Sequence, residues 1–525
     1  MQAMKTTVEQ RKKDIALLQK KHAEQGLSAS EKDQLIDALS QRNLFLEELY
    51  ALAQDNMFGA SSEKQPGQHE LFNEAEEIAE LEEDEPNNVQ DVEPKVKRKR
   101  AAPRQLPKDL PREVIVHDIA PSDKICACCQ SELHCIGTDV TEKLEFIPAS
   151  ARVIEHHRPK YGCRLCEKQG TSNPIKQAPV PNSVMPKSYA TPSLVSQIIT
   201  SKYQFGLPLY RQEQIFAQIE IELSRKTMSD WVIKIAATLS QLLYEPWHNI
   251  LLGQGVMRAD ETPLKVVADD NQKSQMWVYN SGADSPKGNI KEDNTRNIVL
   301  YEYQPTRRGQ CPIDFLRGYN GYLQVDGHAS YHATQARLVG CMAHARRKFI
   351  EAQKHQVKGS KKVTKADWAI NHIQKLYRVE TLIKDMTVEQ RYAIRQEKSK
   401  PLLDQFKTWL DKSATQLAPD SGTGKAVKYT LNQWEKLIRY TEDGRLNLDN
   451  NRSERAVKPF VIGRKNWLFS QTAAGANASA VLYSVIQTAK ANGLIPFDYL
   501  MHVLEKSIEP DCNAESLMPW NVTLD

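Results

Sequence analysis

The sequence predicts a multidomain α/β protein, in which a mixed-sheet domain follows several smaller segments. Three observations support this prediction. At 525 residues the chain is long enough for several domains with cores of their own. Short apolar and β-branched runs gather between residues 255 and 341, whereas helical patterns dominate on both sides of them. Two Cys-x2-Cys pairs stand apart from these regions and indicate a separate small domain.

The composition indicates a soluble globular protein of the cytoplasm. Hydrophobic residues make up 40% of the chain and charged residues 26%. No apolar run reaches the ~20 residues needed to cross a bilayer, and the first residues lack the apolar centre of a signal peptide. The nine cysteines therefore suggest thiols and metal ligands rather than disulfides. A net charge of +4 is mild, so any nucleic-acid affinity must come from local basic patches.

The N-terminal part divides into a helical segment and a linker. Residues 1–57 are expected to be helical, and leucines in the second helix follow the spacing of a short leucine zipper that Arg42 interrupts. Such a segment either packs as a hairpin on its own chain or joins chains into an oligomer. Residues 58–113 are acidic, then basic and proline-rich, which is typical of a disordered linker.

Residues 114–180 are expected to form a zinc-binding domain. Two Cys-x2-Cys pairs supply four sulfur ligands for a structural Zn²⁺, and apolar runs between them suit a zinc ribbon. The predicted ligands are Cys126, Cys129, Cys163 and Cys166. Free buried cysteines are the alternative interpretation. Lesser candidates for ligands are Cys128, Cys135, His134, His156 and His157.

Residues 187–247 are expected to form a helical DNA-binding domain. Three helices are predicted, and Ser224 is a suitable N-cap for the third. The start of this helix resembles the recognition helix of a helix-turn-helix, which presents its first side chains to base edges. An ordinary three-helix unit with Trp231 in its core is the alternative. The candidate DNA contacts are Arg225, Lys226 and Thr227.

Two aspartates stand out among the predicted strands of residues 250–470. Asp260 lies in a β-branched run, and Pro263 argues that this strand is bulged or is not central along its whole length. Asp326 ends another short strand, although an ordinary Asp-Gly turn would also explain it. Acids at the ends of two strands can hold divalent ions, because Mg²⁺ prefers carboxylate oxygen.

A third acid, Glu454, lies among cationic residues between positions 446 and 469. Asp449 or Asn450 can cap a helix here, which puts Glu454 in its first or second turn. Because Glu454 and Lys458 would share a face, an exposed helix with surface ion pairs is the simplest alternative. A helical acid together with two strand-end acids can instead surround two metal ions.

Five stretches resemble the DDE transposases of bacterial insertion sequences of the IS66 type. They are ADETP (259–263), GYLQVDGHASY (321–331), GCMAHARRKF (340–349), DGRLNLDNNRSERAVKPF (443–460) and GRKNWLF (463–469). The resemblance implies a ribonuclease-H-like catalytic domain in which Asp260, Asp326 and Glu454 hold two Mg²⁺ or Mn²⁺ ions. The predicted order of three strands, a helix and a strand suits this fold. Glu261 is a rival for Asp260, but adjacent side chains of a strand face opposite ways.

The resemblance also implies the partners and the reaction. Such an enzyme binds the terminal inverted repeats of its transposon and a target DNA, and it cleaves and transfers strands without a covalent protein–DNA intermediate. A homo-oligomer is expected, small accessory proteins encoded by the same element are possible partners, and the DNA-bound protein would be associated with the nucleoid. The residues expected at DNA phosphates are Arg346, Arg347, Lys348, Arg452, Arg455, Lys458, Arg464 and Lys465.

The remaining segments are expected to be helical. A helical insertion at about 360–440 separates Asp326 from Glu454, and residues 471–525 form a C-terminal helical region. Cys341 and His344 offer only two ligands where zinc needs four, so a packing cysteine and a histidine near the site are the favoured interpretation.

Two other functions are compatible with the sequence. A nuclease on the same scaffold would cut DNA without joining strands. A non-catalytic DNA-binding regulator would use the zinc and helical modules and leave the three acids without a role.

Overall fold

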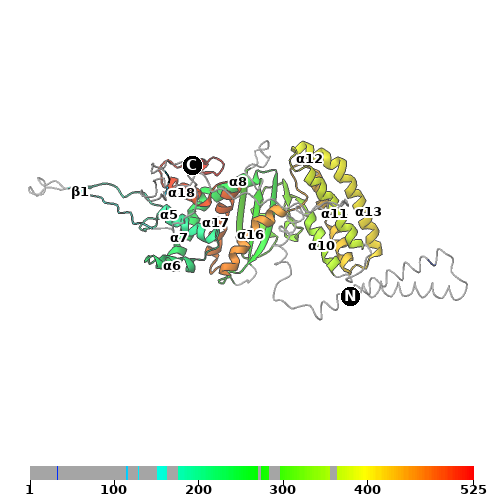
Figure 1. Cartoon of the computed structure of the whole chain (residues 1–525), viewed down its shortest axis with the longest axis horizontal. Helices are drawn as coiled ribbons and strands as arrows, with labels where there is room; N and C mark the ends of the chain where they lie inside the picture. Colours follow the sequence, from blue (N-terminus) through cyan, green and yellow to red (C-terminus); the bar gives the residue numbers. More distant parts are fainter. Residues whose placement is uncertain are drawn as a thin grey trace, which may run out of the picture. The chain divides into compact units, whose positions relative to one another are not determined.

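The computed structural model describes residues 151–161, 175–269, 274–282, 296–354 and 364–524, together with Lys32, Val114, Ile115 and Cys128 (Figure 1). The expectations for residues 1–57 and 58–113, and for the four predicted zinc ligands, lie outside these residues. The chain forms two compact units, of which one comprises residues 85–181. Within that unit, β1 (Lys160–Tyr161) pairs antiparallel with β2 (Lys176–Gln177).

A five-stranded mixed sheet lies at the centre of the other unit. Its strand order is β5-β4-β3-β6-β7; β4 is antiparallel to both β5 and β3, whereas β6 and β7 run parallel to β3. The bounds are β3 (Val256–Leu264), β4 (Ser274–Ser281), β5 (Ile298–Gln304), β6 (Tyr322–Gln324) and β7 (Arg337–Val339), with α9 (Gln310–Phe315) between β5 and β6. The strands and the helix follow the order expected from the sequence.

Pro263 lies where the sequence suggested that a proline could be tolerated. Residues 256–258 of β3 pair with β6, and Arg258 also pairs with Asn280 of β4, but Pro263 pairs only with Gln275 of β4. Because β6 has ended by then, no second neighbour needs the N–H that proline lacks. The prediction that this strand is not central along its whole length is confirmed.

One edge of the sheet is covered by α17 (Ala473–Ala491). Edge strand β5 donates the N–H of Val299 to Thr488 Oγ1 (3.0 Å) and the N–H of Tyr301 to Ser484 Oγ (2.8 Å). These hydroxyls satisfy edge groups that would otherwise be open to pairing with another chain. The helix begins after Thr472, whose side chain accepts the N–H of Gly475 at 3.1 Å, and it lies in the C-terminal helical region expected from the sequence.

The segment expected to bind DNA is helical as predicted, and it shares the apolar core of the sheet. Its bounds are α5 (Pro192–Tyr203), α6 (Leu209–Gln218), α7 (Arg225–Leu239), the π-helical turn η2 (Ser240–Tyr244) and α8 (Glu245–Leu252). Buried Trp231 packs edge-on against Tyr189 and belongs to the same cluster as the sheet residue Met257. C-terminal α18 (Pro496–Lys506) packs on α5.

A second apolar core lies between the helices that separate β7 from α16 (Asn451–Trp467). These helices are α10 (Met342–Lys354), α11 (Lys365–Leu382), α12 (Val388–Ile394), η5 (Arg395–Ser399), α13 (Lys400–Gln416), α14 (Gly422–Asn432) and α15 (Trp434–Ile438). They form the helical insertion that the sequence indicated. In the described part of the chain, no helix is both long enough and apolar enough to cross a membrane.

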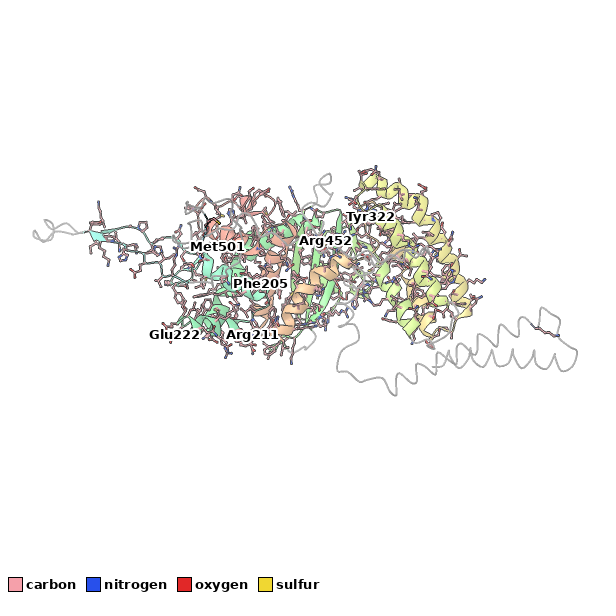
Figure 2. The ribbon with its side chains drawn as sticks, viewed as in Figure 1. Phe205, Arg211, Glu222, Tyr322, Arg452 and Met501 are labelled. Atoms are coloured by element: carbon pink, nitrogen blue, oxygen red, sulfur yellow. The ribbon has the colours of Figure 1, made fainter. Side chains whose placement is uncertain are left out.

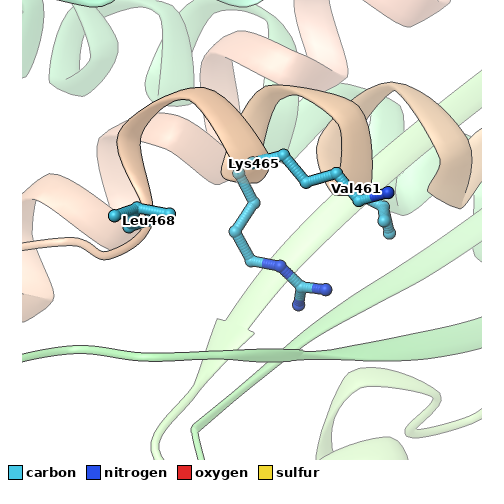
Figure 3. A pocket seen from close by; sticks show the side chains of 4 residues that line it. Val461, Lys465 and Leu468 are labelled. Carbon is cyan, nitrogen blue, oxygen red and sulfur yellow. The ribbon is translucent and has the colours of Figure 1, made fainter. Parts of the chain in front are cut away.

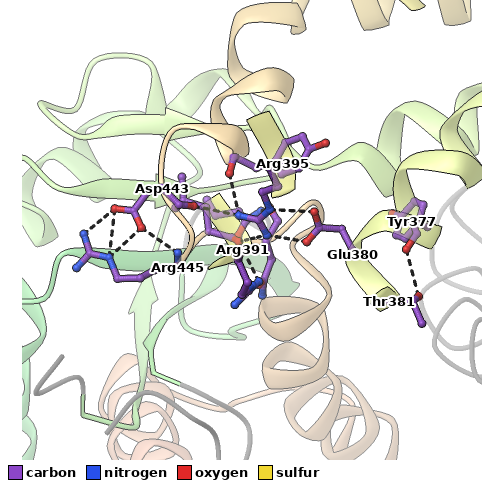
Figure 4. Close-up of polar contacts among 11 residues, drawn as sticks. Tyr377, Glu380, Thr381, Arg391, Arg395, Asp443 and Arg445 are labelled. Atoms are coloured by element: carbon purple, nitrogen blue, oxygen red, sulfur yellow. Dashed lines mark hydrogen bonds and ion pairs between the residues drawn. The ribbon is translucent and has the colours of Figure 1, made fainter. Parts of the chain in front are cut away.

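A buried arginine ties this insertion to the segment that leads into α16 (Figure 4). Arg395 forms a two-pronged ion pair with Glu380 of α11, at 2.9 and 2.6 Å. The same guanidinium donates to the carbonyls of Tyr440, Asp443 and Leu446. The insertion thereby fixes the path of the chain just before α16.

Candidate active site

The parallel pairing of β3 and β6 brings two of the expected acids to the same level of the sheet. Met257 pairs with Leu323 and Arg258 with Gln324. The same register carried two residues further puts Asp326 beside Asp260. Asp326 is the second residue after β6, and its Oδ1 accepts the N–H of His328 at 2.9 Å, which fixes the carboxylate at the start of the turn.

The third acid comes from α16, which packs on β3 and β4 (Figure 1). Asn450, the residue before α16, is buried and donates its side-chain N–H to the carbonyl of Ala259, the neighbour of Asp260, at 3.0 Å. Asn280 of β4 donates to Ser453 Oγ at 2.9 Å. These two bonds hold the first turn of α16, and with it Glu454, over the strand that carries Asp260.

The environment of Glu454 differs from that of a surface helix. Its side chain is 12% exposed and its Oε1 lies 3.8 Å from His344 Nδ1 of α10. Asn450 occupies the N-cap position, but its side chain makes no cap bond and instead donates its N–H to β3. The nearby Asp449 accepts the N–H of Asn451 at 3.3 Å. The alternative of an exposed, salt-bridged helix therefore does not describe this segment.

The pKa of Asp260 is raised by its surroundings. Burial raises it well above the usual range, and the negative charges of Glu261, Asp326 and Glu454 raise it further. Carboxylates brought together without a cation disfavour each other's ionised form. Clusters of this kind are typical of functional sites.

The carboxylate of Glu261, the alternative to Asp260 as a metal ligand, already has two partners. Its side chain is 1% exposed, its Oε1 pairs with Arg307 at 2.5 Å, and its Oε2 accepts the hydroxyl of Tyr331 at 2.7 Å. This ion pair and hydrogen bond account for its buried charge. Burial and the charge of Glu261 also raise the pKa of Tyr331 well above its usual range, so its phenol stays protonated and is a poor nucleophile.

The cations expected at DNA phosphates fall into three groups. Arg452 is buried and donates to the carbonyl of Ser281 at 2.6 Å, against the sheet (Figure 2). The structure thus gives Arg452 an internal role, and we leave it out of the proposed DNA surface. Arg464 is half-buried and donates to Thr262 Oγ1 at 3.3 Å. Arg455 and Lys465 are exposed, whereas Lys458, Arg346, Arg347 and Lys348 are half-buried.

The exposed end of α16 carries a small surface pocket of about 140 Å³ (Figure 3). It is lined by Val461, Arg464, Lys465 and Leu468. Leu468 ends the helix at a φ of 64° and is 68% exposed. Two cationic residues with apolar neighbours thus face solvent at the far end of the helix that starts with Glu454.

The start of α7 has the N-cap that the sequence predicted. Ser224 accepts the N–H of Thr227 at 3.1 Å, which confirms it as the N-cap, and Glu213 of α6 accepts the N–H of Arg225 at 2.9 Å. Arg225 and Lys226 are exposed, while Thr227 is half-buried and bonds through its hydroxyl to Ser224 at 3.0 Å. The two cations are therefore accessible, and the Thr227 hydroxyl serves the cap.

Comparison with known proteins identifies the family. A model described as "Transposase IS66 family" matches residues 187–478, which is more than half of the chain. The chain belongs to the IS66 family of transposases. Further family models match in the expected order: a leucine-zipper model described as "Transposase C of IS166 homeodomain" at 45–115, "zinc-finger binding domain of transposase IS66" at 123–167 and "IS66 C-terminal element" at 484–520. The resemblance seen in the sequence is confirmed.

Similar proteins occur in Sinorhizobium fredii (strain NBRC 101917 / NGR234). "Uncharacterized protein y4jD" is 34% identical over 436 residues, which cover 80% of this chain and 82% of that protein. "Uncharacterized protein y4hP" is 33% identical over 440 residues, covering 81% and 77% of the two chains. The IS66 transposase domain implies a polynucleotidyl transferase that uses a divalent metal and binds DNA, and the zinc-finger model suggests zinc as well.

Two residues around the acids were not singled out as functional from the sequence: Asn450 positions α16, and Tyr429 of α14 donates its hydroxyl to the backbone carbonyl of Asp326 at 3.0 Å. His344 lies beside Glu454, in agreement with the expectation of a histidine near the site. A polar run directly before a helix, Asp449 to Asn451, was the visible signal for Asn450. Tyr429 carries no such signal, because its contact depends on the packing of the insertion.

Proposed function

We propose that this chain is an active DNA transposase that binds transposon ends, cleaves them and transfers the freed strands to target DNA. The proposal rests on one observation above all. The register of β3 and β6 places Asp326 beside Asp260, bonds from Asn450 and Asn280 hold Glu454 over the same strand, and burial together with nearby negative charges raises the pKa of Asp260. We also propose that the sheet is ribonuclease-H-like, which its order of three antiparallel strands followed by two parallel ones supports.

The donor set fits a hard divalent cation. Three carboxylates offer only oxygen ligands, and the repulsion at Asp260 is the kind that a bound cation relieves. We therefore assign Asp260, Asp326 and Glu454 as the ligands of Mg²⁺ or Mn²⁺. When bound in such a site, the ions make an oxygen nucleophile more acidic and stabilise the leaving oxygen of a phosphodiester.

The surrounding residues hold this carboxylate set in place. Asn450 and Ser453 fix the first turn of α16 against β3 and β4, and the Arg307–Glu261 pair neutralises a neighbouring acid that would otherwise compete for the cation. Tyr429 and His328 anchor the backbone and side chain of Asp326. Preorganised groups of this kind allow a reaction to proceed without rearrangement of the site.

Basic residues on two elements would bind the DNA backbone. Arg455 and Lys465 are exposed on α16, and Arg225 and Lys226 are exposed at the start of α7. Lysine and arginine at phosphates supply sequence-independent affinity, whereas the first turn of a recognition helix can read bases. Oligomerisation through the N-terminal leucine-zipper segment would bring two transposon ends together.

The test is a reaction of the full-length protein with labelled transposon-end DNA and a supercoiled plasmid in Mg²⁺. A transposase yields both nicked ends and labelled plasmid, because the freed 3′-hydroxyl is joined to the target. Cut ends without labelled plasmid would replace the proposal with a nuclease. Binding without cleavage, in the presence of any accessory proteins of the element, would favour a regulator.

A further inference from the structure

Three side chains of different ligand chemistry meet beside the carboxylate site. A sulfur of Cys341, a ring nitrogen of His344 and a carboxylate oxygen of Glu454 all lie within 4.8 Å of one another. The distance from His344 Nδ1 to Glu454 Oε1 is 3.8 Å. From the sequence, Cys341 and His344 alone are too few ligands for a metal ion. In the structure, Glu454 of α16 lies beside them as a third candidate ligand.

The backbone around these residues holds the cluster in place. Cys341 lies between β7 and α10, and its sulfur accepts the N–H of Asn450 at 3.2 Å. His344 is in the first turn of α10, and Glu454 is in the first turn of α16. Cys341 is 2% exposed, Glu454 12% and His344 21% by side chain. The cluster is therefore nearly enclosed, and solvent reaches it past the histidine.

The ligand set selects a class of metal. Sulfur, imidazole and carboxylate together are typical of Zn²⁺, whereas Mg²⁺ takes oxygen ligands and water. Bond lengths of about 2.0–2.3 Å to a tetrahedral zinc put neighbouring ligand atoms roughly 3.5 Å apart. Small side-chain movements would close the observed cluster to that size. Three protein ligands also leave a fourth position open, as in zinc sites that carry a water.

We propose that Cys341, His344 and Glu454 form a binding site for a thiophilic divalent cation such as Zn²⁺, distinct from the carboxylate site for Mg²⁺. The two sites share Glu454, so zinc withdraws this acid from the other two. Zinc bound here consequently inhibits the nuclease step. This inhibition rests on the proposed function, but binding of the metal does not.

Zinc binding at Cys341 releases a proton. A free cysteine is a neutral thiol at neutral pH, so the sulfur enters the metal-free site protonated. When the sulfur–zinc bond forms, the thiol proton leaves to solvent, and no oxidant or reductant is needed. Binding therefore weakens as the pH falls.

The competing explanation is that Cys341 only packs and accepts the N–H of Asn450. Cys341→Ser separates the two roles, because a hydroxyl can accept the same N–H but is a weak zinc ligand. Cys311→Ser is the matched control: Cys311 is also buried, its sulfur contacts the carbonyl of Thr306, and it lies in α9 outside the cluster. His344→Ala removes a second ligand at a partly exposed position.

The experiment compares zinc retention and Co²⁺ absorption of the full-length wild type with the three variants, after circular dichroism has verified folding. The Cys-x2-Cys pairs within residues 123–167 are expected to bind metal as well. The signal of interest is therefore the difference in zinc retention and cobalt absorption between each variant and wild type. Cys341→Ser and His344→Ala should each bind the metal at least about a hundredfold more weakly at this site and lose part of the thiolate-to-cobalt absorption. Cys311→Ser should match wild type.

The outcomes separate the site from the proposed activity. Equal zinc retention and equal cobalt absorption in all four proteins would overturn the site, whether or not the protein cleaves DNA. If the site binds zinc, cleavage by wild type in Mg²⁺ should be inhibited by added Zn²⁺, and Cys341→Ser should resist it. Equal inhibition of wild type and Cys341→Ser would overturn the regulatory role.

Discussion

Replacement of Arg395 by alanine should destabilise the helical insertion more than any surface change. Arg395 is fully buried, pairs with Glu380 through two nitrogens, and donates to three carbonyls at 2.8–3.0 Å. Glu380 is 15% exposed, so the alanine variant leaves a largely buried carboxylate without its cation. Removing one partner of a buried pair costs about 3–5 kcal/mol. We expect a loss of this size.

Hydrogen exchange is the suitable assay, because a protein with two cores need not unfold in one step. The free energy of opening should fall by about 3–5 kcal/mol for amides of α11, α13 and α14, and much less for amides of β3 and β4. Lys407→Ala is the control: its ion pair with Asp411 is partly exposed, and such pairs contribute roughly 0–1 kcal/mol. A loss below about 1 kcal/mol for Arg395→Ala would refute the role assigned to this arginine.

Three further predictions concern pH, the acid cluster and DNA. Burial raises the pKa of Glu302 from 4.5 to about 7. The free energy of unfolding should therefore be highest below pH 4.5 and fall by about 3 kcal/mol as the pH rises to 7, because the folded protein holds this carboxyl protonated. Glu302→Gln should flatten this part of the curve of unfolding free energy against pH, and an unchanged curve would contradict the assignment. Burial and nearby negative charges raise the pKa of Asp260, because both disfavour its ionised form. Asp260→Asn should therefore raise the melting temperature of metal-free protein at neutral pH and abolish further stabilisation by Mg²⁺; a lower melting temperature without metal would contradict this reasoning. Arg225→Ala and Lys226→Ala should each reduce the slope of the logarithm of the DNA-binding constant against the logarithm of salt concentration by about one phosphate contact. Lys407→Ala is the control and should leave this slope unchanged. Unchanged slopes in the first two variants would exclude phosphate contacts at the start of α7.

The order of the strands along the chain could be predicted from the sequence, as could the elements that carry Asp260, Asp326 and Glu454. β-branched runs and turn residues are local signals, so the strands around Asp260 and Asp326 were visible, and Pro263 even indicated where β3 loses a neighbour. The long motifs shared with the family supplied Glu454, which local patterns alone would have left on a surface helix. These features depend on residues close together in the chain.

Features that depend on packing between distant segments could not be predicted. Arg452 looked like a DNA contact because it lies in a cation-rich stretch, yet the fold turns it toward the carbonyl of Ser281. Cys341 and His344 lacked a third ligand until α16 brought Glu454 to them. The helices of residues 187–247 looked like an independent domain, but their core is continuous with that of the sheet. No local pattern carries this information.

The most direct test of the central claim is cleavage of labelled transposon-end DNA in Mg²⁺ by Asp260→Asn, Asp326→Asn and Glu454→Gln. These substitutions keep side-chain size and remove a charged ligand. Asp411→Asn, on the exposed face of α13, serves as control, and DNA binding is measured in parallel. We expect each triad variant to lose at least about a hundredfold in cleavage rate while its binding is retained, and the control to match wild type. A triad variant that binds and cleaves like wild type would contradict the account.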